Sequence, residues 1–216
     1  MTALRFEVLS ATPAARSASP AIVFRVRITG GGSEGTAAIA LRCQIQIDAR
    51  LRQYDPDEQQ RLYELFGTPA QWDRTLRSLV WTQASAMVPA FGGDTEIDLV
   101  APCSYDLHVA AANYLHGVRG RDVPLSFLFS GTMFTSQPGS AALWIRPVSW
   151  DSEATFRMPE GVWDAAVDRF FPGRGWIVLS RDTIDALQAF KGQQALPTWD
   201  DAVTALLRAV HTEEPA

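Results

Sequence analysis

The chain has 216 residues, of which 47% are hydrophobic and 20% charged, a composition typical of a globular protein with a large buried core. Its net charge is -5 and its arginines are scattered among acidic residues, so no basic stripe is available to bind nucleic acid. The N-terminus lacks a signal-peptide pattern and no segment approaches the ~20 apolar residues of a membrane helix, so we expect a cytoplasmic protein with neither nucleic acid nor a membrane as partner.

The first part of the chain alternates apolar and polar residues, which is typical of half-buried strands. Strands are predicted at residues 4–8, 22–28 and 39–51. Between the last two, residues 30–35 match the GxGxxG of dinucleotide-binding folds. A phosphate site of that kind needs a following helix, whereas the alternation after Gly35 predicts a strand. We therefore interpret the glycines as a hairpin loop.

A short helical insertion is predicted at residues 56–79. Pro56 stands at the first turn of the expected helix and Gly67 just beyond its end, which are favoured positions for these two residues. A second short helix is expected from Pro69. Residues 80–88 and 95–99 are rich in β-branched or alternating apolar residues and are predicted to be strands.

Residues 105–135 are predicted to form one long β-hairpin, because apolar residues recur at every second position on both sides of a loop at residues 117–122. Its second face, which includes Leu128 and Phe134, is too apolar to face water. We expect it to be covered by the C-terminal helices, by a second copy or by another protein. The C-terminal residues available for this are Phe170, Leu187, Phe190 and Leu206.

From residue 150 the pattern becomes helical. Helices are expected after Pro159, after Ser180 or Asp182, and after Thr198, with a short strand at residues 176–179. Strands without βαβ alternation followed by helices predict an α+β fold. We expect an antiparallel β-sandwich at residues 1–149, carrying the insertion at 56–79, and a C-terminal mainly helical subdomain at 150–216 packed on the sandwich.

The sequence carries no signature of a nucleophile, phosphate or zinc site, and we predict no catalytic residues, no metal and no cofactor. His108 and His116 lie too far apart on the expected strand to share a metal. The carboxylates of Asp94, Glu96 and Asp98 are expected on a solvated strand face. Cys43 and Cys103 have no metal-binding spacing and are expected to be free, buried thiols.

Aromatic residues indicate where a partner could bind, because seven tryptophans are many for this length. Packing between the sandwich and the C-terminal helices is the favoured explanation of the two, because large aromatic side chains are usually buried within their own chain. The candidate partner surface consists of Trp81, Trp144, Trp150, Leu128 and Phe134.

Short stretches along nearly the whole chain resemble a bacterial family of about this length that has no assigned activity, cofactor or catalytic residues. They are residues 79–82, 87–91, 100–105, 123–125, 128–134 and 196–199. The resemblance implies genes beside those of nickel-iron hydrogenases. The chain departs from the family pattern at Gln83, where a histidine is expected, and at residues 173–175.

Two functions follow as hypotheses. The first is a non-catalytic accessory protein that binds another protein or forms a homo-oligomer, in assembly or maturation of a hydrogenase-like redox enzyme. The alternative is a small-molecule-binding protein or enzyme with its site between the sandwich and the C-terminal helices. That alternative requires a cleft in which polar groups converge, for instance those of Asp106, His108, Tyr114 and Arg121.

Overall fold

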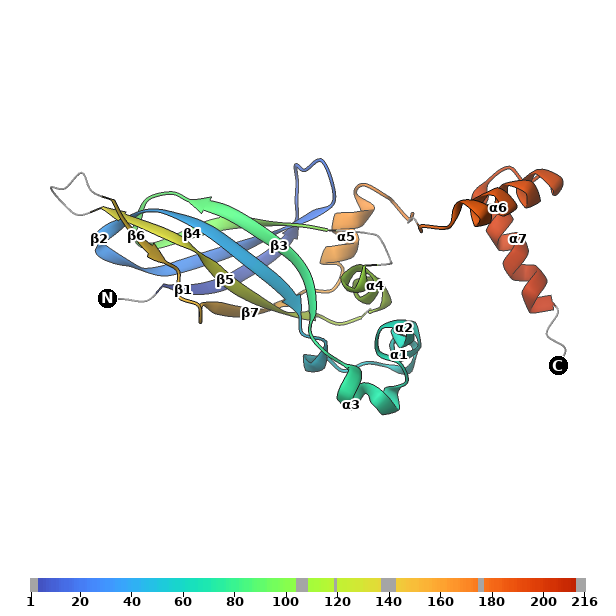
Figure 1. Ribbon diagram of the computed structural model, residues 1–216, viewed down its shortest axis with the longest axis horizontal. Helices are drawn as coiled ribbons and strands as arrows, with labels where there is room; N and C mark the ends of the chain where they lie inside the picture. Colours follow the sequence, from blue (N-terminus) through green and yellow to red (C-terminus); the bar gives the residue numbers. More distant parts are fainter. Residues whose placement is uncertain (1–3, 104–108, 119, 137–142, 175–176, 213–216) are drawn as a thin grey trace. The chain divides into compact units, whose positions relative to one another are not determined.

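The structure is a computed structural model that describes residues 4–103, 109–118, 120–136, 143–174 and 177–212 (Figure 1). It contains two compact units, residues 1–176 and residues 177–216. The first unit holds all seven strands found in the described residues, together with short helices, and the second holds two helices. The α+β class and the antiparallel sandwich followed by helices are therefore confirmed.

Strand β2 (Ala21–Ile47) is the centre of the sandwich, because all seven described strands form one hydrogen-bonded sheet that folds into two layers at this strand. We call the layer of β1, β4 and the first half of β2 the first sheet, and the layer of β3, β5, β6, β7 and the second half of β2 the second sheet. Its first half pairs with β1 (Arg5–Pro13) on one side and β4 (Phe91–Pro102) on the other. Its second half pairs with β3 (Leu79–Val88) and β5 (Val123–Ser136). β5 pairs in turn with β6 (Leu143–Pro147) and β7 (Glu153–Met158). All these pairings are antiparallel.

The glycine-rich segment is not a hairpin loop, because the two halves of β2 do not pair with each other. Instead β2 and its partners β3 and β4 form one long ribbon that turns over at this point, passing from one sheet to the other (Figure 1). Pairing slips between Gly31–Gly93 and Thr36–Phe91. Gly93 has a φ of 78°, a conformation that glycine adopts without strain.

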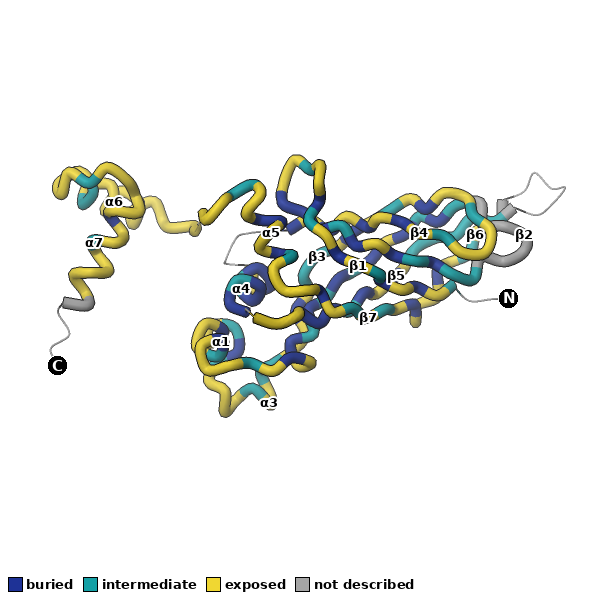
Figure 2. The backbone as a smooth tube through the Cα atoms, turned by 180° about the vertical axis from the view of Figure 1, so that it is seen from behind, coloured by how far each residue is buried: buried dark blue, intermediate teal, exposed yellow. Residues whose placement is uncertain are grey.

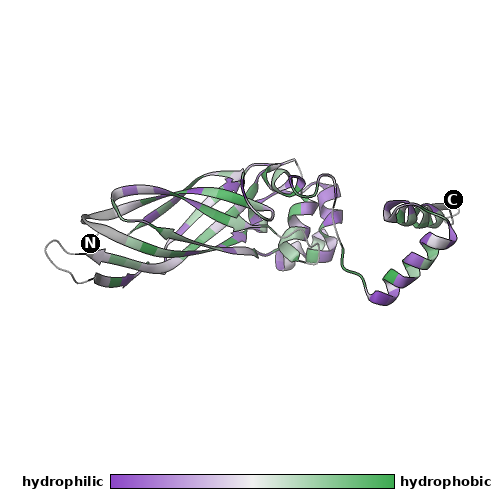
Figure 3. Ribbon diagram, turned by 90° about the horizontal axis from the view of Figure 1, so that it is seen from above, coloured by the Kyte–Doolittle hydropathy of each residue, from purple (hydrophilic) through white to green (hydrophobic). Residues whose placement is uncertain are grey.

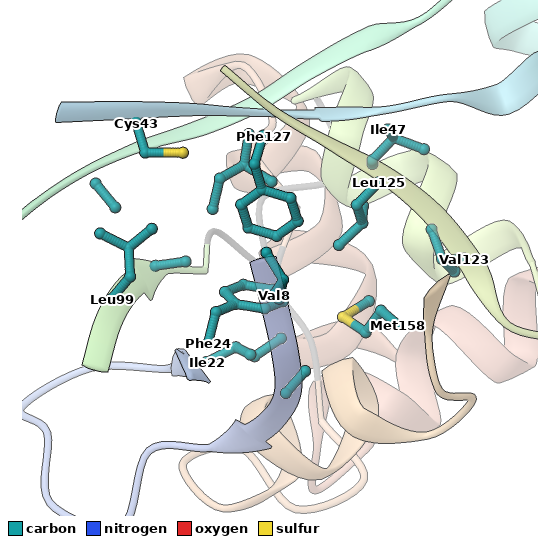
Figure 4. Packing of buried hydrophobic residues seen from close by; sticks show 14 of the residues in the cluster. Val8, Ile22, Phe24, Cys43, Ile47, Leu99, Val123, Leu125, Phe127 and Met158 are labelled. Carbon is teal, nitrogen blue, oxygen red and sulfur yellow. The ribbon is translucent and has the colours of Figure 1, made fainter. Parts of the chain in front are cut away.

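The core lies between the two sheets and follows the predicted alternation. Phe24 of the first sheet meets Phe127 of the second edge to face, with ring centroids 5.0 Å apart (Figure 4). Phe6 stacks on Phe129 with centroids 4.2 Å apart. Alternate β2 residues from Ile22 to Ile28 and from Ile39 to Ile47 are almost completely buried. Burial of this apolar area is the main stabilising contribution to the sandwich.

The predicted hairpin at residues 105–135 is wrong in its first half. Residues 104–108 and 119 lie outside the described residues, and Ala110–Gly117 form helix α4. Three consecutive alanines favour a helix, and the buried residues Ala111, Tyr114 and Leu115 also fit a helical period. The second half of the prediction is confirmed as β5.

The segment between β2 and β3 consists of several short helical pieces. These are the 3-10 helices Ala49–Leu51 and Pro69–Gln71 (η1 and η2) and helices α1 (Pro56–Arg61), α2 (Tyr63–Phe66) and α3 (Trp72–Thr75). Asp55 and Glu58 form a capping box at the start of α1. Later in the first unit, α5 (Val162–Asp168) packs against β1 and β2.

The second unit contains α6 (Arg181–Gln193) and α7 (Trp199–Thr212). The hydroxyl oxygens of Ser180 and Thr198 cap these helices by accepting hydrogen bonds from the backbone N–H groups of Thr183 and Asp201. The strand expected at residues 176–179 is wrong for residues 177–179, which have no regular secondary structure, and Trp176 lies outside the described residues. Packing of this unit on the sandwich stays a prediction. No helix of the described chain is long and apolar enough to cross a membrane.

Candidate protein-binding surfaces

A buried polar network connects the helical insertion to α4. Arg52 and Glu58 form an ion pair of 2.7 Å with both side chains almost fully buried. The hydroxyls of Tyr54 and Tyr114 are 2.7 Å apart, and Tyr54 also donates to the carbonyl of Ala49. Burial raises the pKa of Tyr54 to about 12 and raises the pKa of Tyr114 as well. The network therefore fixes structure, because Arg52 is paired with Glu58 and the two tyrosine hydroxyls are paired with each other inside the protein.

The outer face of the first sheet is covered by ion pairs. Arg25 lies 2.9 Å from Asp98, and Arg27 lies 3.0 Å from Glu96 and 3.3 Å from Glu7. The predicted row of carboxylates is thus a half-exposed ladder in which Glu96 and Asp98 face arginines across the strands. Exposed pairs of this kind contribute little to stability, because water and salt screen the charges.

The outer face of the second sheet is chemically different, because β2, β3 and β5 give it few charges, and Glu153 and Arg157 lie on it only at the β7 margin, opposite Leu128 and Pro124 of β5. Leu128 and Phe134 lie on this face of β5, opposite Gln44 and Ala38 of β2. Arg42 is the one charged side chain that the described residues of β2, β3 and β5 place there. Leu128 is exposed and Phe134 is half-buried, so two of the predicted partner residues do share a surface.

The three tryptophans of the predicted surface do not join these two residues. Trp81 is half-buried and meets Phe24 of the core edge to face, with ring centroids 6.1 Å apart. Trp144 alternates with Ile145, the cross-strand neighbour of Phe134, and therefore belongs to the opposite face of β6. Trp150 is 94% exposed in the turn between β6 and β7. The predicted set is spread over several surfaces.

The two thiols are buried as expected. Burial raises the pKa of Cys43 and of Cys103 to about 12, which keeps both in the unreactive neutral form. Among the described residues, no group of three or more histidine, cysteine, aspartate or glutamate side chains is placed to hold a metal ion.

The two described members of the predicted polar constellation, Tyr114 and Arg121, do not share an open cleft. Asp106 and His108 lie outside the described residues, and Tyr114 is buried in the network. Arg121 lines a small cavity between α4, α5 and the adjoining ends of β5 and β7, together with Glu160, Trp163 and Asp164. Its volume of about 70 Å³ is far below the ~300 Å³ of typical small-molecule sites.

The richest exposed apolar surface lies in the second unit, in what we call the C-terminal hairpin (residues 177–212). It holds nine of the nineteen exposed large hydrophobic residues in the described chain. They are Ile177, Val178, Leu179, Ile184, Trp199, Val203, Leu206, Leu207 and Val210. Hydrophobic residues recur along both helices, and most of α6 and α7 is exposed (Figures 2 and 3).

Sequence reasoning assigned Leu206 of α7 to packing on the sandwich. Trp199, Val203, Leu206 and Val210 follow one another at spacings of four, three and four residues, which places them on one side of the helix. In the hairpin as described, Ala202 is the one buried residue. The spacing therefore identifies the apolar face, whereas the periodicity contains no information about what covers it.

Comparison with known proteins gives structural likenesses of low score. A solution structure described as a late embryogenesis abundant protein is 14% identical, with a TM-score of 0.31 over 73% of this chain and 72% of the other. A β-glucosidase from Paenibacillus barengoltzii is 15% identical, with a TM-score of 0.27 over 74% of this chain and 14% of the β-glucosidase. A β-glucosidase from Kluyveromyces marxianus is 9% identical, with a TM-score of 0.25 over 73% of this chain and 15% of the β-glucosidase. TM-scores this low carry no argument about fold or function.

No curated protein matches the sequence. A family model does match, and it covers residues 1–215. This agrees with the resemblance seen in the sequence insofar as the family is one without an assigned function. The chain belongs to DUF6084, a family of unknown function.

Proposed function

We propose that the protein is a non-catalytic accessory protein that binds another protein through its C-terminal hairpin. The observation that carries the proposal is the concentration of nine exposed large apolar residues within residues 177–210. Exposed apolar side chains gathered in this way mark interaction surfaces, because each favours removal from water.

The poor packing of the hairpin against itself supports the proposal. Trp199, Val203 and Leu207 are each more than 40% exposed, although they lie on a helix with a clear apolar side. Two short helices alone bury too little apolar area to offset the loss of chain entropy on folding. A partner that covers this side would stabilise the hairpin and would itself be bound by the same contacts.

The narrower form of the proposal is that the partner belongs to the assembly or maturation of a hydrogenase-like redox enzyme. Its support is the gene neighbourhood implied by the family resemblance. The second candidate function, a small-molecule site, is supported by the cavity around Arg121, Glu160 and Asp164. That cavity has the size of an ion or a few waters, so the protein-binding proposal is favoured.

Affinity purification from native extract followed by mass spectrometry tests the proposal. The variant Val203→Gln/Leu207→Gln removes two exposed apolar side chains from α7, and glutamine keeps a high helix propensity. Val100→Gln, which changes an exposed valine on β4, is the matched control. We expect a partner that is recovered with the wild type and the control and is lost with the hairpin variant.

Two results would contradict the proposal. One is the absence of any reproducible partner under mild conditions. The other is recovery of the same proteins with the wild type and with Val203→Gln/Leu207→Gln. Circular dichroism of the variant checks that α6 and α7 are still helical, so that a lost partner reports a lost surface.

A further inference from the structure

Strand β3 differs in its chemistry from every other outer strand of the described sandwich. The outer strands are those that pair on one side, namely β1, β3 and β4 on β2 and β6 and β7 on β5. Four of them carry charged residues, with prolines at the ends of β1 and β6. These residues are Arg5 and Glu7 on β1, Asp94, Glu96 and Asp98 on β4, Arg146 on β6, and Glu153 and Arg157 on β7. β3, with the sequence LVWTQASAMV, has no charge, proline or glycine.

This difference matters because an outer strand presents unpaired backbone N–H and C=O groups. Charged side chains and prolines on such strands oppose the addition of a further strand, and β3 has neither. Its ten residues pair with β2, and no other strand of the described residues pairs with its far side. Val80 and Met87 are 58% and 68% exposed, and Gln83 and Ser85 are also exposed. Helix α4 also contacts β3, and the rest of the strand offers a long, uncharged edge.

The sequence of β3 is complementary to itself when two copies run antiparallel. The bulge of β3 against β2, where Ile45 pairs with Thr82 and Gln46 with Val80, sets which residues face outward. They are Val80, Gln83, Ser85 and Met87. A two-fold axis at Ala84 then places Gln83 opposite Ser85 and, past the bulge, Val80 opposite Met87. Polar residues meet polar ones, and apolar residues meet apolar ones, on the same face of the sheet.

We propose that β3 pairs antiparallel with β3 of a second copy of this chain, about a two-fold axis at Ala84, so that the second sheets of two copies become continuous. Charge supports a second copy as the occupant, because a two-fold arrangement brings similar residues together. On β4 the same arrangement would place Asp94, Glu96 and Asp98 near their own copies, which is unfavourable. β3 has no charge that could repel its copy.

Sedimentation of the full chain over a range of concentrations tests the proposal with a matched pair of variants. Gln83→Glu/Ser85→Glu places glutamates opposite each other twice in the proposed register. Gln83→Lys/Ser85→Glu differs at residue 83 alone and places a lysine opposite each glutamate. Both positions are exposed, and the carboxylate introduced by Ser85→Glu would lie beside Arg42 of β2 within each copy, so both variants should fold.

We expect the wild type to form a dimer. The dissociation constant of the dimer should rise at least about tenfold with Gln83→Glu/Ser85→Glu, and it should return toward the wild-type value with Gln83→Lys/Ser85→Glu. Amide exchange in residues 80–88 should slow as the wild-type concentration rises. A wild type that is monomeric at all concentrations overturns the proposal, as would be found if an extended segment of another protein were the occupant. A dimer that survives the double glutamate, or that is lost instead with Val203→Gln/Leu207→Gln, also overturns it.

Discussion

The hydroxyl groups of Tyr54 and Tyr114 form a hydrogen bond of 2.7 Å, although the two residues lie 60 positions apart in the chain. Tyr54 follows η1 and Tyr114 belongs to α4, so this hydrogen bond connects two helical segments of the first unit. Tyr54 is the better connected of the two, because it also donates to Ala49.

We predict that Tyr54→Phe destabilises the protein more than Tyr114→Phe does. Removing the Tyr114 hydroxyl should cost about 1 kcal/mol of unfolding free energy, because Tyr54 keeps its bond to Ala49. Removing the Tyr54 hydroxyl leaves that of Tyr114 buried without this partner and should cost about 1–3 kcal/mol. Urea unfolding measures both. Equal effects, or a double variant whose loss is the sum of the two, would contradict the coupling.

Stability should fall at high pH because of Tyr54. Its ordinary pKa is 10.0, and burial raises the pKa to about 12 in the folded protein. Between these values the unfolded chain loses the proton and the folded chain keeps it, so rising pH favours unfolding by up to about 1.4 kcal/mol per pH unit. Below pH 10 the contribution is fully present. Unfolding measured at neutral pH and above pH 10 should show a smaller decline in Tyr54→Phe than in the wild type.

Cys43 and Cys103 should react slowly with a thiol reagent at neutral pH. Both are buried, and a pKa of about 12 leaves almost no thiolate in the folded state. Labelling followed by mass spectrometry should give fast modification of both thiols in urea and slow modification in native buffer. Rapid labelling of native Cys103 would point to a redox or metal-transfer role.

Gly131→Ala should be strongly destabilising. Gly131 has a φ of 149°, and an added Cβ would lie 2.2 Å from the carbonyl oxygen of Ala40, a backbone atom of the neighbouring strand. We expect a loss of about 3 kcal/mol or more. Gly92→Ala is the control, because no heavy atom lies within 4 Å of its added Cβ. Thermal or urea unfolding should show Gly92→Ala close to the wild type, and two similar losses would refute the steric cause.

Two truncations should behave differently. A chain that ends at residue 176 keeps every strand of the described sandwich and is expected to remain folded. A chain that ends at residue 154 loses most of β7 and all of α5, with the buried residues Met158, Trp163 and Val167. It should be insoluble or self-associating, because the apolar surface beside β5 is uncovered. Light scattering and circular dichroism distinguish the outcomes, and a well-folded shorter chain would show that β7 and α5 are dispensable.

The strands of the sandwich could be predicted from the sequence where one face is buried and the other wet. Ile22 to Ile28 and Ile39 to Ile47 alternate because each sheet has a core side. The same rule misled at residues 110–117, where Ala111 and Leu115 fit both periods, whereas the buried Tyr114 fits the helical period alone and three alanines favour the helix. The alternation of residues also could not predict which strands pair on either side of residues 30–35. A glycine-rich segment can either close a hairpin or let a strand continue from one sheet into the other.

The candidate surfaces were harder to predict than the strands. Leu128 and Phe134 were placed on one face correctly, because alternation along a single strand fixes their direction. Trp81, Trp144 and Trp150 were grouped by residue type, although their positions depend on pairing and turns that the sequence does not specify. The self-complementary edge of β3 depends on a bulge that changes which residues face outward. A bulge is defined by the register against the partner strand, so the sequence of β3 alone could not predict it.

The central position of β2 also affects how the protein forms during synthesis. The second half of β2 emerges early, yet its partner β3 begins at Leu79 and its other partner β5 ends at Ser136. Contacts between segments so distant in the chain form slowly. Until residues 123–136 have been made, the second half of β2 therefore lacks β5, one of its two neighbouring strands, and its isoleucines are incompletely covered.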